Sequence, residues 1–318
     1  MAAEEDVRRE PVTGFGRFQW RTGRWLAIFD RQVDVIRRDL KKAHAEDRVV
    51  IYLSCPVTGR GGGHAGTNVE IANVTARRLM HRYGDRVFVL NPAAYQLESR
   101  EGTGLVLEHI RALFGGVDAQ ANDAPDEYLT RLRNEYEPQG GDYMRMWIRV
   151  LAEDQFDILA EARRGLNCGG LFDAFYFLGP TDVAEYFRVD FTGPTTPAVE
   201  TYFARKYATD LEFRTDYDFS GRPGERTALD LASDAGRAEW EQRRKDFFRF
   251  YSVRASANFS KGCRDEWNTL VRLNGRRRIA KPYGPSEEIA AYFDGAQVAP
   301  GCVDKMGPRG YELSEAEP

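Results

Sequence analysis

The stretch Val49–Leu79, VVIYLSCPVTGRGGGHAGTNVEIANVTARRL, decides the fold class. It opens with a nearly continuous apolar run of strand length, passes through three glycines, and resumes as a helical segment that continues to Tyr83 and ends at Gly84. A second apolar run, Arg86–Leu90, follows. Two such strands joined through a loop and a helix are typical of a parallel β-loop-α-β unit with a right-handed crossover. The sequence therefore predicts an α/β protein with a Rossmann-like parallel sheet flanked by helices.

Patterns on either side of this unit extend the prediction. Apolar periodicity and turn residues predict helices over Arg24–Ala45, Asp142–Arg163 and Pro197–Ala208, and strands over Phe172–Leu178 and Leu211–Thr215. From Arg222 onward the pattern changes to long charged helices, chiefly Asp234–Arg249 and Lys261–Leu273. The glycine-containing segment Asn91–Gly141 reads as an irregular insertion. We expect residues 1–220 to form the α/β domain and residues 221–318 to form a C-terminal helical extension packed on it.

Composition restricts the functional classes. The 318-residue chain has a formal net charge of −4, which gives no basic field for nucleic acid. Its four cysteines are far apart and form no metal-ligand pattern, so we expect free thiols and no bound metal. No run reaches the roughly 18 apolar residues needed to cross a bilayer, and the first residues lack an apolar core. A cytoplasmic protein without a membrane partner is expected.

The break after the first strand is the leading candidate for a binding site. Ligands of open parallel sheets lie beyond the carboxyl ends of the strands, and glycine backbone next to a helix N-terminus favours phosphate. The candidate phosphate-binding residues are Ser54, Arg60, Gly61, Gly62, Gly63 and His64. A flexible turn is the alternative interpretation of the glycines.

Three further residues are candidates for contacts with a nucleotide. Asn91 follows the second strand and could bind a ribose or a base edge, although a turn role before Pro92 fits equally well. Tyr143 and Trp147 could stack on a base, with core packing as the alternative.

The order of these parts resembles the nucleoside 2-deoxyribosyltransferase superfamily. YLSCPVTGRGGG, a helix, a strand, a helix preceding FDAFYFLGP, and a later helix with an early Glu occur in that order over roughly residues 49–210. Within the superfamily, the sequence is most similar to nucleoside 5′-monophosphate N-glycosidases, whose first loop carries a Gly-x-x-Arg-Gly-Gly element that residues 57–62 match in part. The resemblance implies hydrolysis of the bond between base and sugar, with no cofactor, and a homodimer.

The resemblance also implies a carboxylate nucleophile that attacks the anomeric carbon and a second acidic group that assists the base. Glu200, in TTPAVETYFARKYA, stands where the family places its nucleophile, and Glu185, in TDVAEYF, is the competing assignment. Neither is followed by the family's usual glycine. Asp142 is the candidate acid, with helix N-capping as its alternative role.

Other functions fit parts of the sequence. GGGHAGTNVE resembles the signature of cytokinin-activating phosphoribohydrolases, with Gly66, Thr67 and Glu70 matching its GTxxE part. Transfer of the sugar to a second base is a further possibility. A non-catalytic nucleotide-sensing module is the alternative outside the enzymes.

Overall fold

A five-stranded sheet forms the centre of the computed structural model, which describes residues 7–9, 11–12, 16–59, 61–114, 138–153, 171–188, 194–221, 226–280, 288–298 and 310–314. The strand order is β11-β10-β7-β5-β6. The bounds are β5 Val49–Ser54, β6 Val87–Leu90, β7 Ala174–Phe177, β10 Ala290–Phe293 and β11 Ala296–Gln297. All neighbouring pairs are parallel except β10 and β11. The α/β class with a mostly parallel sheet is confirmed.

The register brings the carboxyl ends of the parallel strands to one edge. Ser54 is opposite Phe177, and Phe177 is opposite Phe293. Tyr52, two residues before the end of β5, is opposite Leu90. The loops that follow β5 and β6 therefore begin close together.

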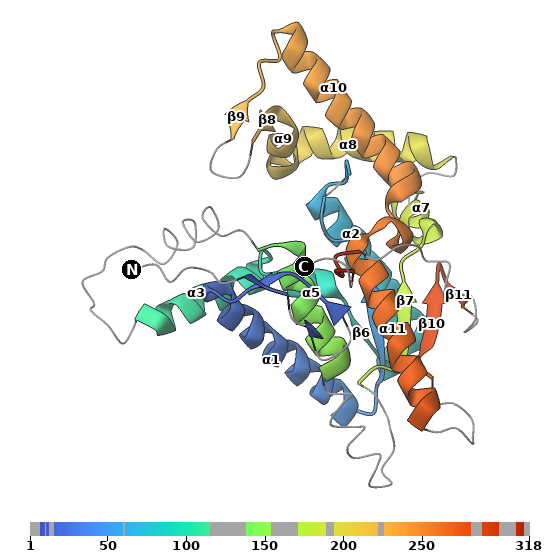
Figure 1. Cartoon of the computed structure of the whole chain (residues 1–318). Helices are drawn as coiled ribbons and strands as arrows, with labels where there is room; N and C mark the ends of the chain where they lie inside the picture. Colours follow the sequence, from blue (N-terminus) through green and yellow to red (C-terminus); the bar gives the residue numbers. More distant parts are fainter. Residues whose placement is uncertain are drawn as a thin grey trace.

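Helices cover both faces of the sheet. On one face, α1 (Arg24–Ala45), α5 (Gly140–Ile148) and α11 (Lys261–Ala280) share a core with Tyr52 and Phe177, and α5 lies between α1 and α11 (Figure 1). On the other face, α2 (Ala65–Tyr83) and α7 (Pro180–Arg188) share a core with Leu53. Because β5 side chains alternate between faces, Tyr52 and Ser54 point toward the α11 side.

Three more helices gather at one end of the molecule, at the top of Figure 1: α8 (Thr195–Thr209), α9 (Leu211–Asp218) and α10 (Asp234–Arg249). Phe203 of α8 holds them together through edge contacts with Phe213 and Phe247, at centroid distances of 5.3 and 5.2 Å. The strand predicted over Leu211–Thr215 is wrong. Asp210 starts a helix there by accepting a hydrogen bond from the Phe213 backbone N–H at 3.1 Å, and Phe213 and Tyr217 face the core one turn apart.

The remaining elements are short, apart from α3 (Arg100–Phe114), which lies in the segment predicted to be irregular. They comprise the two-residue pairs β1 (Val7–Arg8) with β4 (Trp20–Arg21), β2 (Pro11–Val12) with β3 (Gly16–Arg17), and β8 (Phe219–Ser220) with β9 (Thr227–Ala228). Short helical segments cover Gly84–Arg86, Pro92–Tyr95, Arg149–Glu153, Phe250–Arg254 and Ala257–Phe259.

The part of the chain after residue 220 is not purely helical. It supplies α10 and α11 but also β10 and β11, and β10 pairs directly with β7. The helix predicted over Asp142–Arg163 is described as far as Glu153, and its remainder lies outside the described residues.

Candidate functional site

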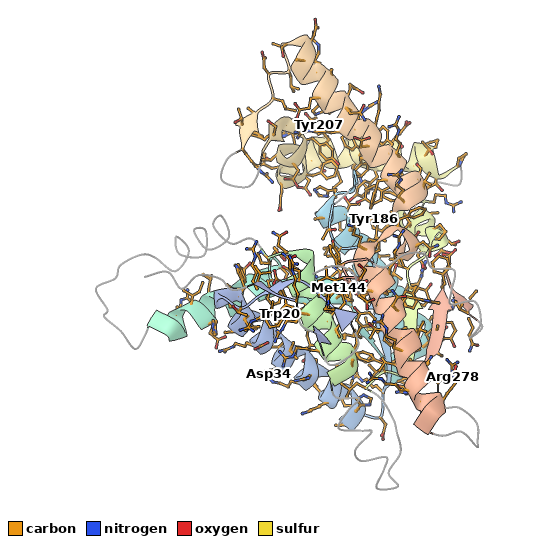
Figure 2. All side chains as sticks on the ribbon, viewed as in Figure 1. Trp20, Asp34, Met144, Tyr186, Tyr207 and Arg278 are labelled. Carbon is orange, nitrogen blue, oxygen red and sulfur yellow. The ribbon has the colours of Figure 1, made fainter. Side chains whose placement is uncertain are left out.

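A pocket of about 520 Å³ opens at the carboxyl edge of the sheet. Its walls come from the loops after β5 and β6, the first turn of α2, the faces of α5 and α11, and the C-terminal segment around Tyr311. Met144 of α5 is one of the wall residues, and Figure 2 labels it near the middle of the molecule. This is the place at which open parallel sheets bind their ligands.

Glu266 of α11 places a buried carboxyl group in the pocket wall. Only 5% of the residue is exposed. The Tyr52 hydroxyl donates a hydrogen bond to its Oε1 at 2.7 Å, and the Ser54 hydroxyl donates to its Oε2 at 2.5 Å. Burial raises the pKa of Glu266 to about 7, against the lowering effect of the two hydroxyl donors. The carboxyl group is therefore held in one orientation and can change its charge near neutral pH.

Two cysteines, Cys55 and Cys263, line the same pocket as free, buried thiols. Burial raises the pKa of each thiol above its usual value. Both thiols are therefore protonated at neutral pH and are poor nucleophiles. Free thiols are confirmed for these two residues, and Cys168 and Cys302 lie outside the described residues.

The first turn of α2 forms another side of the pocket. Thr58 and Gly59 of the preceding loop and Ala65 and Gly66 of the helix line it. The N–H groups of a helix's first turn have no partner within the helix, and they lie at the positive end of the helix dipole. This side of the pocket therefore suits an anionic group.

The glycine run serves the packing of α10. Gly61 and Gly62 have φ values of 80° and 102°, which favour glycine. A Cβ on Gly62 would lie 2.8 Å from the Asp246 carbonyl oxygen, and one on Gly63 would lie 2.7 Å from the Phe250 ring. The run therefore lets α10 approach the loop closely, a requirement that is independent of any phosphate.

His64 caps α2. Its Nδ1 accepts a hydrogen bond from the Thr67 backbone N–H at 3.0 Å, so the ring proton is on Nε2, which lies 3.1 Å from Asp216 Oδ2. With Gly62 and Gly63, His64 lines a second pocket of about 370 Å³, which also contains Arg226 and Arg243. The two arginines are already paired there, with Asp216 and with the Phe219 carbonyl oxygen. Arg60 lies outside the described residues.

The aromatic candidates fall in the first pocket, and Asn91 does not. Tyr143 and Trp147 both line the pocket, and the Tyr143 hydroxyl donates to the carboxylate of Glu98, another wall residue. The Asn91 side chain is buried in a turn. Its Oδ1 accepts from the Ala93 N–H at 3.0 Å and its Nδ2 donates to Asn73 at 2.8 Å.

The structure does not bring the predicted acidic residues to this pocket. Glu200 is exposed on α8, a helix that adds no residue to the described pocket lining. Glu185 is 55% exposed on α7 and pairs with Arg78 of α2. Asp142 is buried at the start of α5, where it accepts backbone N–H groups from Gln139 at 2.8 Å and Arg21 at 2.7 Å. The capping role, which the sequence also allowed, accounts for Asp142.

Thr67 and Glu70 of the GTxxE match also face away from the pocket. Thr67 contacts His64, and Glu70 accepts hydrogen bonds from Tyr186, from Tyr202 at 2.9 Å and from Lys206 at 2.5 Å. Figure 2 labels Tyr186 in the upper half of the molecule, above Met144. These contacts join α2 to α7 and α8 and lower the pKa of Glu70 despite its burial.

Comparison of the chain with protein-family models, curated proteins and solved structures found no match. Within the described ranges, no group of three His, Cys, Asp or Glu side chains is arranged to hold a metal ion. In the same part of the chain, no helix is both long and apolar enough to span a membrane.

Proposed function

We propose that the protein hydrolyses the N-glycosidic bond of a nucleoside 5′-monophosphate, with Glu266 as the nucleophile. The observation that carries this proposal is the Glu266 carboxylate, buried and held by Tyr52 and Ser54 where it borders a pocket at the sheet edge. The expectation of a carboxylate nucleophile is kept, and its assignment moves from Glu200 to Glu266.

The chemistry requires a carboxylate in a fixed position. Departure of the base builds positive charge on the anomeric carbon, and a nearby carboxylate stabilises that charge or bonds to the carbon to form a sugar ester, which water then hydrolyses. The two hydroxyl donors keep the Glu266 oxygens from rotating, which lowers the entropic cost of reaching the reactive geometry. Protonated Cys55 and Cys263 do not compete for the sugar.

The two other sides of the pocket suit the ends of a nucleotide. The first turn of α2, with Thr58 and Gly59 before it, offers backbone N–H groups to a 5′-phosphate. Tyr143 offers its ring to the base, whereas Trp147 is 3% exposed and packs against Tyr52 in the core beside it. Glu98, which accepts a hydrogen bond from Tyr143, is the wall carboxyl we assign to assist departure of the base, in place of Asp142.

The test is base release from a panel of nucleoside 5′-monophosphates, followed by chromatography. Glu266→Gln keeps the shape of the side chain but removes the nucleophile, and we expect it to lower turnover by about 1,000-fold or more while nucleotide binding persists. Glu200→Gln and Glu185→Gln are matched controls that should remain within a few-fold of the parent. Full turnover by Glu266→Gln would overturn the assignment.

A nucleotide-sensing module is the second candidate, and one set of contacts favours it. The Tyr251 hydroxyl contacts the backbone N–H and carbonyl of His64, each at 3.0 Å, and His64 contacts Asp216 of α9. Occupancy of the α2 end of the pocket could thus change the contacts of α9 and of the Phe250–Arg254 segment that follows α10. Thermal stabilisation by nucleotides without release of base would favour the sensor.

Adding a free base to the assay would reveal transfer of the sugar instead of hydrolysis.

A further inference from the structure

The segment Gly310–Ser314 is fastened to the start of α11 by a single buried carboxylate. Asp265 is 1% exposed. Its Oδ1 accepts hydrogen bonds from the backbone N–H groups of Gly310 at 2.8 Å and Glu312 at 3.4 Å, and its Oδ2 accepts from Tyr311 at 2.6 Å. Three consecutive backbone donors thus converge on one side chain, which fixes the path of the segment.

Two glycines allow this segment to pack closely against α5 and the start of α11. A Cβ on Gly310 would lie 1.8 Å from the Lys261 carbonyl oxygen, so only glycine fits at this point. A Cβ on Gly140 would lie 2.3 Å from the Tyr311 ring, so the ring rests directly on the backbone at the start of α5. The Lys261 ammonium lies 5.6 Å from the centre of the same ring. The ring is therefore fixed on more than one side.

Two contacts beyond Tyr311 hold the rest of the segment. Arg272 of α11 pairs with Glu312 at 2.6 Å, and the Leu313 backbone N–H donates to the Arg17 carbonyl at 2.8 Å. Residues from both ends of the described chain and from α11 thus meet beside the pocket.

Tyr311 is one of the residues that line the pocket, together with Tyr143 and Trp147. We infer that the Tyr311 ring is a base-recognition surface, which stacks on the heterocycle of the nucleotide, and that Asp265 is the positioning residue that holds the ring there. This inference rests on the proposed function for the identity of the ligand. Asp265 precedes Glu266 on α11, so the same helical turn positions the proposed nucleophile and, through Asp265, the Tyr311 ring.

Stacking makes a specific prediction about ligands. A ring that stacks on a base contributes to binding of any ligand with a base and contributes nothing to a ligand without one. Ribose 5-phosphate has the sugar and phosphate of the proposed substrate and lacks the base. Comparison of these two ligands therefore separates the role of Tyr311 from a general loss of structure.

The experiment measures binding by titration calorimetry with full-length protein carrying Glu266→Gln, so that the nucleotide is not consumed. The ligands are a nucleoside 5′-monophosphate and ribose 5-phosphate. We expect Tyr311→Ala to weaken nucleotide binding by about 5-fold or more and to leave ribose 5-phosphate within 2-fold. Tyr311→Phe keeps the ring and should match the parent. Asp265→Asn should change the two affinities in the same pattern as Tyr311→Ala.

The outcomes distinguish the inference from the function on which it rests. If the parent binds the nucleotide but Tyr311→Ala leaves its affinity unchanged, or lowers both affinities equally, the role of Tyr311 is overturned and the proposed function stands. If the parent binds neither ligand, both are overturned.

Discussion

The Tyr52 hydroxyl oxygen lies 2.7 Å from Glu266 Oε1, and this hydrogen bond joins β5 of the central sheet to α11. Burial raises the pKa of Glu266 well above the usual range of a glutamate, and the hydrogen bonds from Tyr52 and Ser54 lower it in part. The balance leaves the group able to ionise near pH 7.

Tyr52→Phe should therefore change the pH profile of base release. Loss of one donor raises the pKa of Glu266 above about 7, so the rise of kcat with pH should move to higher pH, and kcat at pH 7 should fall by about 10- to 100-fold. Base release measured from pH 5 to 9 checks this. Tyr83→Phe, at an exposed tyrosine of α2, is the matched control. An unshifted profile in Tyr52→Phe would show that Glu266 does not govern the rate.

Glu266 should also make stability depend on pH. Its pKa is about 7 in the folded protein and about 4.5 in the unfolded chain, so the folded state binds the proton more tightly. The free energy of unfolding should therefore fall as pH rises from about 4.5 to about 7. The raised pKa of Asp265, about 6, contributes in the same direction at lower pH.

Glu266→Gln removes its share of this dependence. We measure the free energy of unfolding by urea at pH 5, 6, 7 and 8. Over this range it should change by about 3 kcal/mol less in Glu266→Gln than in the parent. Glu200→Gln, at an exposed position of α8, should reproduce the parent curve. Parallel curves for Glu266→Gln and the parent would mean that Glu266 is not buried in solution.

The two glycines with positive φ before α2 should differ in their tolerance of a methyl group. Gly61→Ala meets open space and carries the backbone cost of about 1 kcal/mol alone, because nothing lies within 4 Å of the added Cβ. Gly62→Ala meets the Asp246 backbone 2.8 Å away and should cost more than about 2 kcal/mol. Urea unfolding measures the loss of unfolding free energy in each variant. Equal losses would show that α10 does not pack closely against the loop.

Asp142 tests the capping role against the catalytic one. Asp142→Ala removes the charged acceptor of two part-buried hydrogen bonds, from the backbone N–H groups of Arg21 and Gln139, and should lower the free energy of unfolding by about 2 kcal/mol. Asp142→Asn keeps an acceptor oxygen and should release base within a few-fold of the parent. A loss of 100-fold or more in a stably folded Asp142→Asn protein would restore the catalytic assignment.

Local patterns predict the central elements well and the edge elements poorly. Val49–Ser54 is a strand with the predicted bounds because it is a nearly continuous apolar run. Asp234–Arg249 is a helix with the predicted bounds, and Ser233 caps its start by accepting a hydrogen bond from the Gly236 N–H. β10 is a four-residue run with weak pattern of its own, and its pairing with β7 is a long-range contact. α3 contains Gly102, which reads as a loop residue. A Cβ added at this position would lie 2.1 Å from the Gln96 carbonyl oxygen, so glycine is needed for the close contact between α3 and the Gln96 backbone.

The candidate site combines residues that sequence reasoning found with others that it missed. Ser54 is a candidate because it ends a predicted strand, and Tyr143 and Trp147 are candidates because aromatic rings can stack on a base. Glu266 was missed because it lies 212 residues from Ser54 in a charged helix. One signal was present: Cys263, Trp267 and Leu270 form the buried stripe of α11, and Glu266 lies on the same side. A carboxylate within an apolar stripe indicates a buried, partnered group.

The separation of Tyr52 and Glu266 by 214 residues also sets when the site can exist during translation. At about 5 to 20 residues per second, a ribosome needs on the order of 10 to 40 seconds to add α11 after β5 has been made. A nascent chain interrupted in that interval has the Tyr52 and Ser54 hydroxyls and the amino end of α2, but not the carboxyl group to which those hydroxyls donate. Premature termination thus yields a fragment that lacks both Glu266 and the wall that α11 adds to the pocket.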